Sequence, residues 1–571
     1  MARVENNYKT LKEALNDVYT MDKLKPLAKK IGKKAPLRKA ELIEHITAIT
    51  FSTLKEIISK MKPMAVNALA EAIHNWDGVF KQDQFMAKYG EYPLEKTKLR
   101  YNEVDILHLF FINGKLPEDL LARLKTIIPP PEEEGITYNE AWESSKITIR
   151  ETSHAALMNL NMLLTMVEER KIRVSQKTGK ATAATVKKIS ANLCEGDFYE
   201  EKENDPMQAF AWPLLLQGGG LATSDGGFLK LTRAGKNALQ KDLPGGIKTL
   251  FKKWQKTKII DEYSRVTAVK GQRAAKGRTM TAPARRRPTI HEALSCLEPG
   301  KWVDFDEMER FMVSENHVFE MTNLDWKLYF SDPQYGSLDY CTTWPLLQKR
   351  YLLIYFFEYC ATLGILDVTY IHPNNARNDF SDCWGADDLE FLSHCDGLMQ
   401  IRLTELGAYA LDILDEYGTT DGQDFELQDT CIAHTGSDLP TPNHTLFLNK
   451  FTEQQASKRW EISFASLINA VKSEETTLKE IRKFITDLTA KKPGTALNKL
   501  FKEVEERSSA VVQAGEVTLL TCRLEARKQI LTDQQLSKLC MPAGDRHLVI
   551  LPGKKELFAK RLEALGFILG I

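Results

Sequence analysis

Apolar residues recur at helical spacing through most of the chain, and two stretches repeat one pattern of apolar and small residues. The first reads Leu231-Thr-Arg-Ala-Gly-Lys-Asn-Ala-Leu239, and the second reads Leu403-Thr-Glu-Leu-Gly-Ala-Tyr-Ala-Leu411. In each, the Thr can cap a new helix, and the Leu, Ala and Leu of the pattern fall on one helix face. The letters W-P-L-L also occur twice, at Trp212 and at Trp344. The pattern predicts a short strand that enters a helix, in two copies.

The first copy resembles a winged-helix module. We expect its wing strands at residues 221–223 and 228–231, joined by a hairpin turn at 225–227, where the sequence is Asp-Gly-Gly. Arg233 and Lys236 then lie at the start of the following helix, where they can meet phosphate. A duplicated winged helix implies nucleic-acid or protein partners rather than a single catalytic pocket.

The second copy resembles the same module with an insertion. We expect a strand and a capped helix across 301–308, a buried helix at 351–363, and wing strands at 365–370 and 398–403. The residues between these wing strands, 372–396, are rich in acids and are expected to form a long wing tip; they are called the acidic stretch below. Because acids repel a phosphate backbone, this unit is expected to bind protein or to pack internally.

The N-terminal residues predict a helix, a loop and a second helix. An amphipathic helix spans 20–32 and ends at a Gly, a loop covers 33–37, and the next helix begins at Arg38. This arrangement resembles the SAP module, a DNA-binding motif. The resemblance implies that six bases face phosphates: Lys29, Lys30, Lys33, Lys34, Arg38 and Lys39. The alternative is a helical hairpin whose charges are only solvated.

The C-terminal residues predict a compact α/β unit. Phe464-Ala-Ser-Leu-Ile-Asn-Ala470, Val517-Thr-Leu-Leu-Thr-Cys522, Leu548-Val-Ile-Leu-Pro552 and Arg561-Leu-Glu-Ala-Leu-Gly-Phe567 carry its apolar spacing. Residues 445–571 thereby resemble the helicase-associated domain found at the N-terminus of XPB-type DNA-repair helicases, which also occurs in bacterial proteins without a motor. The chain has no G-x-x-x-x-G-K-[ST] phosphate loop. The resemblance therefore implies a platform for a motor carried by another chain.

The charge is balanced in total but unevenly placed. The chain has 77 Lys+Arg and 77 Asp+Glu, yet residues 248–288 hold thirteen bases against two acids, and 372–430 hold two bases against fourteen acids. Because Gly, Ala, Pro and Arg dominate the end of the basic stretch, we expect an exposed loop that grips phosphate. Its expected contacts are Lys270, Arg273, Lys276, Arg278, Arg285, Arg286 and Arg287.

No residue set matches a metal or hydrolase motif. The nine cysteines include no C-x-x-C pair, and neither G-x-S-x-G nor H-E-x-x-H occurs. Cys383, His394 and Cys395 lack a second metal-binding half. Four acids that could hold a nuclease metal fall in a sequence typical of a loop: Asp379, Asp382, Asp387 and Asp388. We therefore expect no enzyme activity, no cofactor and no metal.

The N-terminus carries no apolar signal core, and the most apolar run, at 351–360, is too short to span a bilayer and contains Glu358. A cytoplasmic location with reduced thiols is expected.

The expected fold class is mainly α with small β-sheets, in several domains, as the length of 571 residues indicates. The predicted boundaries are 1–50 (SAP-like arm), 51–135 (helical domain), 136–247 (first winged-helix region), 248–288 (basic linker), 289–435 (second winged-helix unit) and 436–571 (helicase-associated domain).

The predicted function is a non-catalytic DNA-binding adaptor that recruits a separate helicase or nuclease for DNA repair or defence against foreign DNA. The expected DNA is duplex, bound with little sequence preference. Two alternatives remain open: a sequence-specific winged-helix transcriptional regulator, and a pure protein-interaction scaffold.

Overall fold

The computed structural model describes residues 7–31, 38–94, 104–132, 135–199, 205–240, 242–273, 279–338, 341–417, 425–436, 440, 442–456, 458–472, 476–511 and 517–570. Helices predominate, and the strands form several small sheets, so the predicted fold class is confirmed. The chain divides into two compact units, residues 1–420 with 441–446 and residues 421–440 with 447–571.

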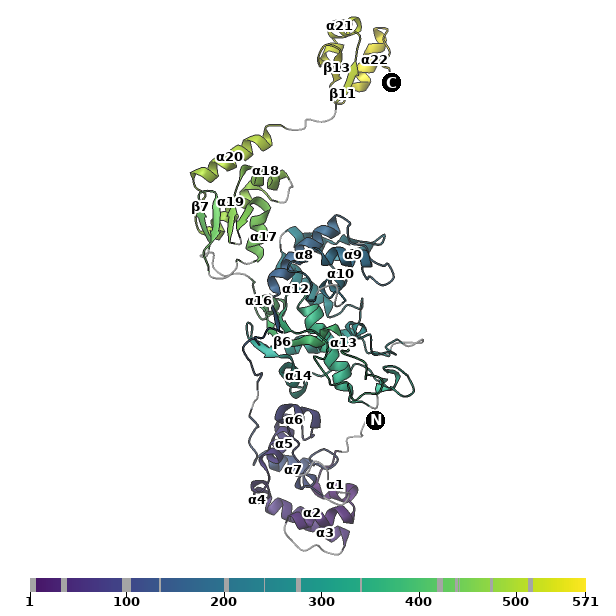
Figure 1. Ribbon diagram of the computed structural model, residues 1–571, viewed down its shortest axis with the longest axis vertical. Helices are drawn as coiled ribbons and strands as arrows, with labels where there is room; N and C mark the ends of the chain where they lie inside the picture. The colour runs from purple at the N-terminus through teal and green to yellow at the C-terminus, as the bar shows by residue number, and fades with distance from the viewer. Residues whose placement is uncertain are drawn as a thin grey trace. The chain divides into compact units, whose positions relative to one another are not determined.

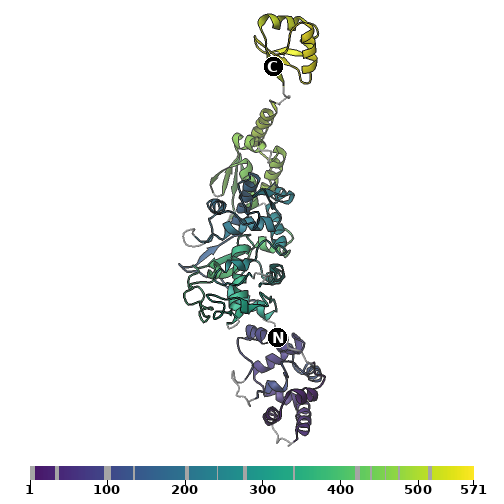
Figure 2. The same ribbon diagram turned by 90° about the vertical axis from the view of Figure 1, so that its right-hand side faces the viewer.

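The N-terminal residues form a bundle of short helices, drawn in purple in Figure 1 and seen from a second direction in Figure 2. Its elements are α1 (Leu11–Val18), α2 (Met21–Lys30), α3 (Lys39–Ser52), α4 (Leu54–Ser59), α5 (Pro63–His74), α6 (Gln82–Tyr89), η1 (Ile106–Leu109) and α7 (Glu118–Leu124).

The two helices of the predicted SAP-like arm are confirmed as α2 and α3, while the intervening loop, 32–37, lies outside the described residues. One apolar core runs from Leu11 to Ile128. The Tyr19 hydroxyl donates to the carbonyl oxygen of His108 at 2.7 Å, which ties the first helices to η1. The predicted arm and helical domain therefore fold around a common core.

The residues from 136 to 417 share a second apolar core. Its elements are β1 (Thr148–Arg150), α8 (Ser153–Glu168), α9 (Ala183–Ser190), α10 (Gln208–Gly218), β2 (Ala222–Asp225), β3 (Phe228–Leu231), α11 (Arg233–Gln240), α12 (Leu243–Trp254), η2 (Glu262–Arg265), α13 (Pro283–Leu294), β4 (Trp302–Asp304), α14 (Phe305–Ser314), η3 (Asp325–Lys327), η5 (Pro345–Lys349), α15 (Arg350–Ile354), η6 (Tyr355–Cys360), β5 (Leu366–Tyr370), η7 (His394–Gly397), β6 (Leu398–Leu403) and α16 (Glu405–Ala410).

The strands predicted for the two wings are confirmed, and each pair is antiparallel. In the first unit β2 pairs with β3, and Gly226 and Gly227 turn the chain with φ of 60° and 82°. In the second unit β5 pairs with β6 inside a sheet of order β1-β5-β6-β4. The predicted strand and capped helix at 301–308 are β4 and the start of α14.

The repeated L-T-x-x-G pattern has one structural role in both units. The Thr232 hydroxyl donates to the Gly220 carbonyl (2.8 Å) and accepts from the Gly235 amide (3.1 Å). The Thr404 hydroxyl donates to the Gly364 carbonyl (2.6 Å) and accepts from the Gly407 amide (2.8 Å). Each Thr therefore caps its helix and fastens it to the turn that precedes the wing.

The W-P-L-L repeat, in contrast, has no common position. Trp212 lies eight residues before Gly220, but Trp344 lies twenty residues before Gly364, the equivalent turn glycine. Trp212 is fully buried in α10, whereas the Trp344 indole donates to Glu309 at 2.6 Å. The recurrence of W-P-L-L therefore does not reflect a shared structural element.

The segment predicted as a basic linker, 248–288, is part of the core. It contains most of α12, η2 and the start of α13, and Leu250, Phe251 and Trp254 are buried. Pro283 occupies the first turn of α13, where a missing amide hydrogen costs nothing. The segment is therefore not a linker. The exposed loop predicted for its end is wrong at the start of α13, where Arg286 and Arg287 are buried.

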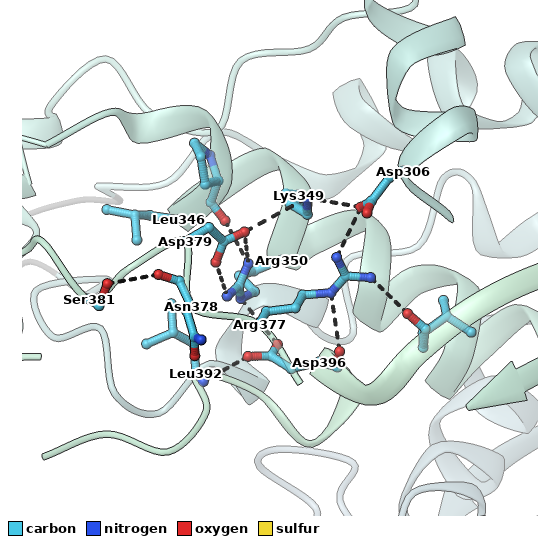
Figure 3. Close-up of polar contacts among 12 residues, drawn as sticks. Asp306, Leu346, Lys349, Arg350, Arg377, Asn378, Asp379, Ser381, Leu392 and Asp396 are labelled. Atoms are coloured by element: carbon cyan, nitrogen blue, oxygen red, sulfur yellow. Dashed lines mark hydrogen bonds and ion pairs between the residues drawn. The ribbon is translucent and has the colours of Figure 1, made fainter. Parts of the chain in front are cut away.

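The acidic stretch is largely irregular, as predicted, but charged pairs fasten it to the core (Figure 3). Arg350 is fully buried, with Nη2 2.6 Å from Oδ1 of Asp379 and Nε 3.1 Å from Oδ1 of Asp396. Arg377 lies 3.0 Å from Asp306 and donates to the Leu398 carbonyl at 2.7 Å. Asp379 therefore holds a buried guanidinium in place and is not free to bind a nuclease metal.

From residue 425 onward the apolar side chains form two clusters. The first belongs to β7 (Phe425–Gln428), β8 (Cys431–His434), α17 (Pro442–Phe451), β9 (Glu453–Ala456), β10 (Arg459–Glu461), α18 (Phe464–Lys472), α19 (Leu478–Thr489) and α20 (Thr495–Ser509). The second belongs to β11 (Thr518–Thr521), α21 (Leu524–Thr532), η9 (Leu536–Lys538), β12 (Cys540–Pro542), β13 (His547–Ile550) and α22 (Lys555–Ala564).

The start of this region lies earlier than predicted. The strands β7 and β8, which the predicted boundary assigned to the second winged unit, belong to a sheet of order β7-β8-β10-β9. In this sheet, Ile432 of β8 pairs with Leu427 of β7 on one side and with Trp460 of β10 on the other. Strand pairing across more than twenty residues decides this boundary, and no local signal marks it.

Candidate nucleic-acid interface

The N-terminal bases predicted to face phosphate lie at the ends of α2 and α3. Lys29 and Lys30 are exposed in the last turn of α2. Arg38 is exposed 3.8 Å from Glu41, and the Lys39 ammonium donates to the Asn16 carbonyl at 2.7 Å. Lys33 and Lys34 lie outside the described residues.

The bases predicted in the first winged unit and beyond it are mostly on the surface. Arg233 and Lys236 are exposed on α11. Lys270, Arg273 and Arg285 are also exposed, and the Lys270 ammonium donates to the Thr267 carbonyl at 2.8 Å. The predicted contacts Lys276 and Arg278 lie outside the described residues.

Arg286 and Arg287 contradict the prediction, because neither side chain has any exposed surface. Arg286 binds the carboxylate of Asp261 through two nitrogens, at 2.8 and 3.2 Å. Arg287 donates to Glu262 at 2.7 Å. A buried guanidinium needs an acid partner, and both partners precede it by 25 residues. These two arginines hold the core together and cannot meet a phosphate.

One further basic segment was not among the contacts predicted from the sequence. Residues 170–194, called the basic segment below, contain seven Lys/Arg and no Asp/Glu. The bases are Arg170, Lys171, Arg173, Lys177, Lys180, Lys187 and Lys188. The sequence feature that marks this segment is the absence of acids, because its bases are spread out and do not form a dense cluster. The total charge of the surrounding region does not reveal it.

The fold places the basic segment beside the first wing. The backbone of Arg173 forms an antiparallel β-bridge with Phe228 at the start of β3, and Val174 forms another with Ala181. The segment therefore folds back as an extra hairpin next to the wing. The Arg173 guanidinium lies over the Phe228 ring, 5.3 Å from its centroid. The segment then enters α9, capped by the Thr182 hydroxyl.

Three exposed lysines of this segment have no ion pair within the described part of the chain: Lys177, Lys187 and Lys188. Others are partly neutralised, since Arg170 lies 3.4 Å from Asp225 and Lys171 lies 2.5 Å from Glu169. The net charge of this surface is therefore positive, which favours a phosphate ligand.

Lys180 connects the basic segment to one of the predicted contacts. Burial lowers the pKa of Lys180, and the positive charges of Arg265 and Arg273 lower it further. Its ammonium lies over the Phe210 ring at 5.3 Å. The electrostatic effect of Arg273 on Lys180 indicates that the two side chains contribute to one positive region.

In neither winged unit does the helix directly before the wing expose side chains that could read bases. α10, the helix before the first wing, contains no charged residue, and its side chains from Ala211 to Leu216 are all buried. Residues 351–360, before the second wing, are buried throughout. A helix that fills the core cannot insert side chains into a groove.

The acidic stretch presents a different surface. Trp384 is 53% exposed and lies 6.1 Å from the ring of Tyr335, which is 64% exposed. Four exposed acids share the stretch with this tryptophan: Asp382, Asp387, Asp388 and Glu390. This combination of exposed aromatic rings and acids, called the acidic-aromatic surface below, fits a basic protein partner better than DNA.

The cysteine and histidine trio considered in the sequence does not assemble. Cys383, His394 and Cys395 form no group of metal-binding atoms among the described residues. Burial and neighbouring Cys341 raise the pKa of the Cys383 thiol to about 12, which keeps it protonated. The described residues do contain one potential ligand group elsewhere, at His154, Cys194 and Glu195.

In the part of the chain that the structure describes, helices of sufficient length and apolar character to cross a bilayer do not occur. A scan against protein-family models and a search of curated proteins both returned no match to this chain.

Proposed function

We propose that this protein is a non-catalytic, DNA-binding adaptor that positions a separate helicase or nuclease. In this proposal the basic segment binds the phosphate backbone of duplex DNA, with the N-terminal SAP-like helices as a second contact. The acidic-aromatic surface and the C-terminal unit bind the partner protein. Genome maintenance and defence against foreign DNA are both consistent settings.

The basic segment carries the DNA-binding part of the proposal. It has seven bases without an acid, and three of its exposed lysines lack an ion pair in the described residues. Each lysine that neutralises a phosphate releases condensed counterions, which gives an affinity that falls steeply with salt. The extra hairpin beside β3 carries Lys177, and α9 carries Lys187 and Lys188, so regular backbone elements hold these charges in place.

The burial of α10 favours sequence-tolerant binding over a specific regulator. A regulator of this class reads bases with side chains of an exposed helix in the major groove. Contacts from Lys177 and Lys187 to phosphate would position the protein but carry no base preference.

The partner-binding part is supported by surface chemistry and by resemblance. The exposed Trp384 and Tyr335 provide rings for cation–π contacts, and the surrounding acids attract bases. Residues 445–571 resemble the helicase-associated domain of XPB-type helicases, and the chain lacks a phosphate loop of its own. In this proposal a helicase on another chain supplies the ATP-driven activity.

A fluorescence-anisotropy titration tests the proposal, with the full chain, duplex and single-stranded probes of unrelated sequence, and several salt concentrations. We expect duplex binding without sequence preference and a linear fall of log K with log salt, of slope about −0.9 per phosphate contacted. Retention of one duplex over competitor DNA would favour the transcriptional regulator instead. Absence of binding at low salt would eliminate DNA and leave the protein scaffold.

A further inference from the structure

Three side chains in the first winged unit bring together nitrogen, sulfur and oxygen donors. His154, Cys194 and Glu195 each offer a ligand atom, and these atoms all lie within 4.8 Å of one another. We propose that these three residues bind a Zn²⁺ ion. The inference is independent of the proposed function.

The ligands come from two separate elements. His154 lies in the first turn of α8, and Cys194 with Glu195 follow α9, forty residues later. A zinc ion would therefore join the start of α8 to the connection between α9 and α10. No short spacing motif links these ligands, so a motif search of the sequence could not find the site.

Each of the three residues keeps a donor atom that is not engaged elsewhere in the described residues. Neither the His154 ring nor the Cys194 sulfur takes part in a hydrogen bond within that part of the chain. The Glu195 carboxylate lies 3.2 Å from Nε of Arg150 through Oε2, which leaves its second oxygen for a metal. A nitrogen, a sulfur and an oxygen donor are thus available at one point.

The backbone that carries Cys194 and Glu195 is held in place before any ion binds. The Cys194 amide donates to Oδ1 of Asn159 at 2.7 Å, and Asn159 is buried on α8, the helix that carries His154. Arg150 donates to the carbonyl oxygens of Glu195 (2.8 Å) and Gly196 (2.9 Å). Such supporting contacts orient the ligands of metal sites and raise their affinity.

The donor set selects the ion. Zn²⁺ accepts histidine, cysteine and carboxylate together, whereas Mg²⁺ and Ca²⁺ prefer oxygen ligands alone. A Cys194 thiolate and the Glu195 carboxylate carry two negative charges, which attract the divalent ion, although the Glu195 charge is shared with Arg150. Burial raises the pKa of Cys194 and lowers that of His154, so the free thiol holds its proton and the free imidazole is neutral. Forming the Zn–S bond releases the thiol proton to solvent.

Three protein ligands leave the fourth position of a tetrahedral ion to water. Glu195 also lines a cavity of about 390 Å³, together with Lys187, Ser190 and Tyr199. A solvent-accessible cavity beside Glu195 gives the ion a path to the site.

The test strips the full chain with a chelator and adds Zn²⁺ or Co²⁺ by titration. We expect about one ion per chain. We also expect the Co²⁺ form to show a thiolate-to-metal charge-transfer band, because Cys194 binds through sulfur. Cys194→Ser is expected to abolish this band and to weaken Zn²⁺ binding more than tenfold, and His154→Ala to weaken binding similarly. The control is Cys296→Ser, which removes an exposed thiol outside the site and should change neither result.

A Co²⁺ spectrum of the wild-type chain without a thiolate band would overturn the proposal, and this readout needs no variant to fold. Zn²⁺ binding that is equally tight in Cys194→Ser would also overturn it. Circular dichroism of each variant separates loss of the site from loss of the fold.

Discussion

Arg287 donates through Nε to Oε1 of Glu262 at 2.7 Å, and neither side chain has any exposed surface. The Trp254 indole donates to the same oxygen at 2.8 Å, and the Tyr351 hydroxyl donates to the other at 3.0 Å. One carboxylate therefore joins α12, η2, α13 and α15. The ion pair lies where the sequence suggested an exposed, DNA-binding arginine run.

Removing one partner of this pair should destabilise the fold. Arg287→Ala leaves Glu262 as a buried charge without its cation, which costs about 3–5 kcal/mol of unfolding free energy. The measurement is chemical denaturation followed by tryptophan fluorescence. The matched control is the neighbouring Arg285→Ala, whose side chain is exposed and should change stability by less than about 0.5 kcal/mol. Equal stabilities of the two variants would contradict the burial of Arg287.

Gly407 lets α16 lie directly against Ile365, the residue before β5, in the second winged unit. A Cβ atom at this position would lie 2.2 Å from the Ile365 carbonyl oxygen, and one at Gly235 in the first unit would lie 2.1 Å from that of Leu221. Gly407→Ala must push α16 away from β5, and we expect a loss of about 1–3 kcal/mol. Thermal denaturation measures it.

Gly135→Ala serves as the control for this prediction, because a Cβ atom at Gly135 meets nothing within 4 Å. If Gly407→Ala melted at the same temperature as Gly135→Ala, the shared architecture of the two units would be refuted.

The exposed lysines of α9 should contribute to DNA affinity. Replacing Lys187 and Lys188 with Gln removes two charges, weakens binding to every duplex tested and lowers the magnitude of the salt slope by about 2. Lys554→Gln with Lys555→Gln removes the same charge from an exposed site in the C-terminal unit and should leave the slope unchanged. Identical slopes for the two double variants would remove α9 from the interface.

His291 should make the fold sensitive to acid. Burial, reinforced by the charge of Arg287, lowers the pKa of His291 to about 3. In the unfolded chain the histidine pKa is about 6.5. Between about pH 3 and about pH 6.5 the unfolded chain therefore binds a proton at His291, and the folded chain does not. This residue lowers the unfolding free energy by about 1.4 kcal/mol for each pH unit of acidification in that range.

His291→Phe isolates this effect. The ring of His291 is stacked on Phe251 with centroids 4.1 Å apart, so phenylalanine keeps the packing and cannot be protonated. The variant loses the contact of Nε2 with the Tyr355 hydroxyl and that of Nδ1 with the Gln255 side chain, so it should be less stable at pH 7. Its unfolding free energy, from urea titrations between pH 4.5 and 6.5, should nevertheless fall less steeply with acid. Parallel pH profiles would show that His291 is protonated in the fold.

Local features of the sequence were sufficient to predict the wings and helix caps. The β2–β3 hairpin follows from alternating residues around a two-glycine turn, and the cap at Thr404 follows from a hydroxyl placed three residues before a small residue. These interactions join residues that are near neighbours in the chain, so both partners of each interaction can be recognised in a short stretch of sequence.

Only the tertiary structure decided where charged residues point. Arg285, Arg286 and Arg287 are consecutive and chemically identical, yet only the first is exposed, because Asp261 and Glu262 face the other two. The approach of His154 to Cys194 likewise depends on how α8 and α9 pack. The sequence determined the β2–β3 hairpin and the helix caps, since these depend on neighbours. The burial of a charge depends on a distant partner that offsets its desolvation, and packing alone supplies that partner.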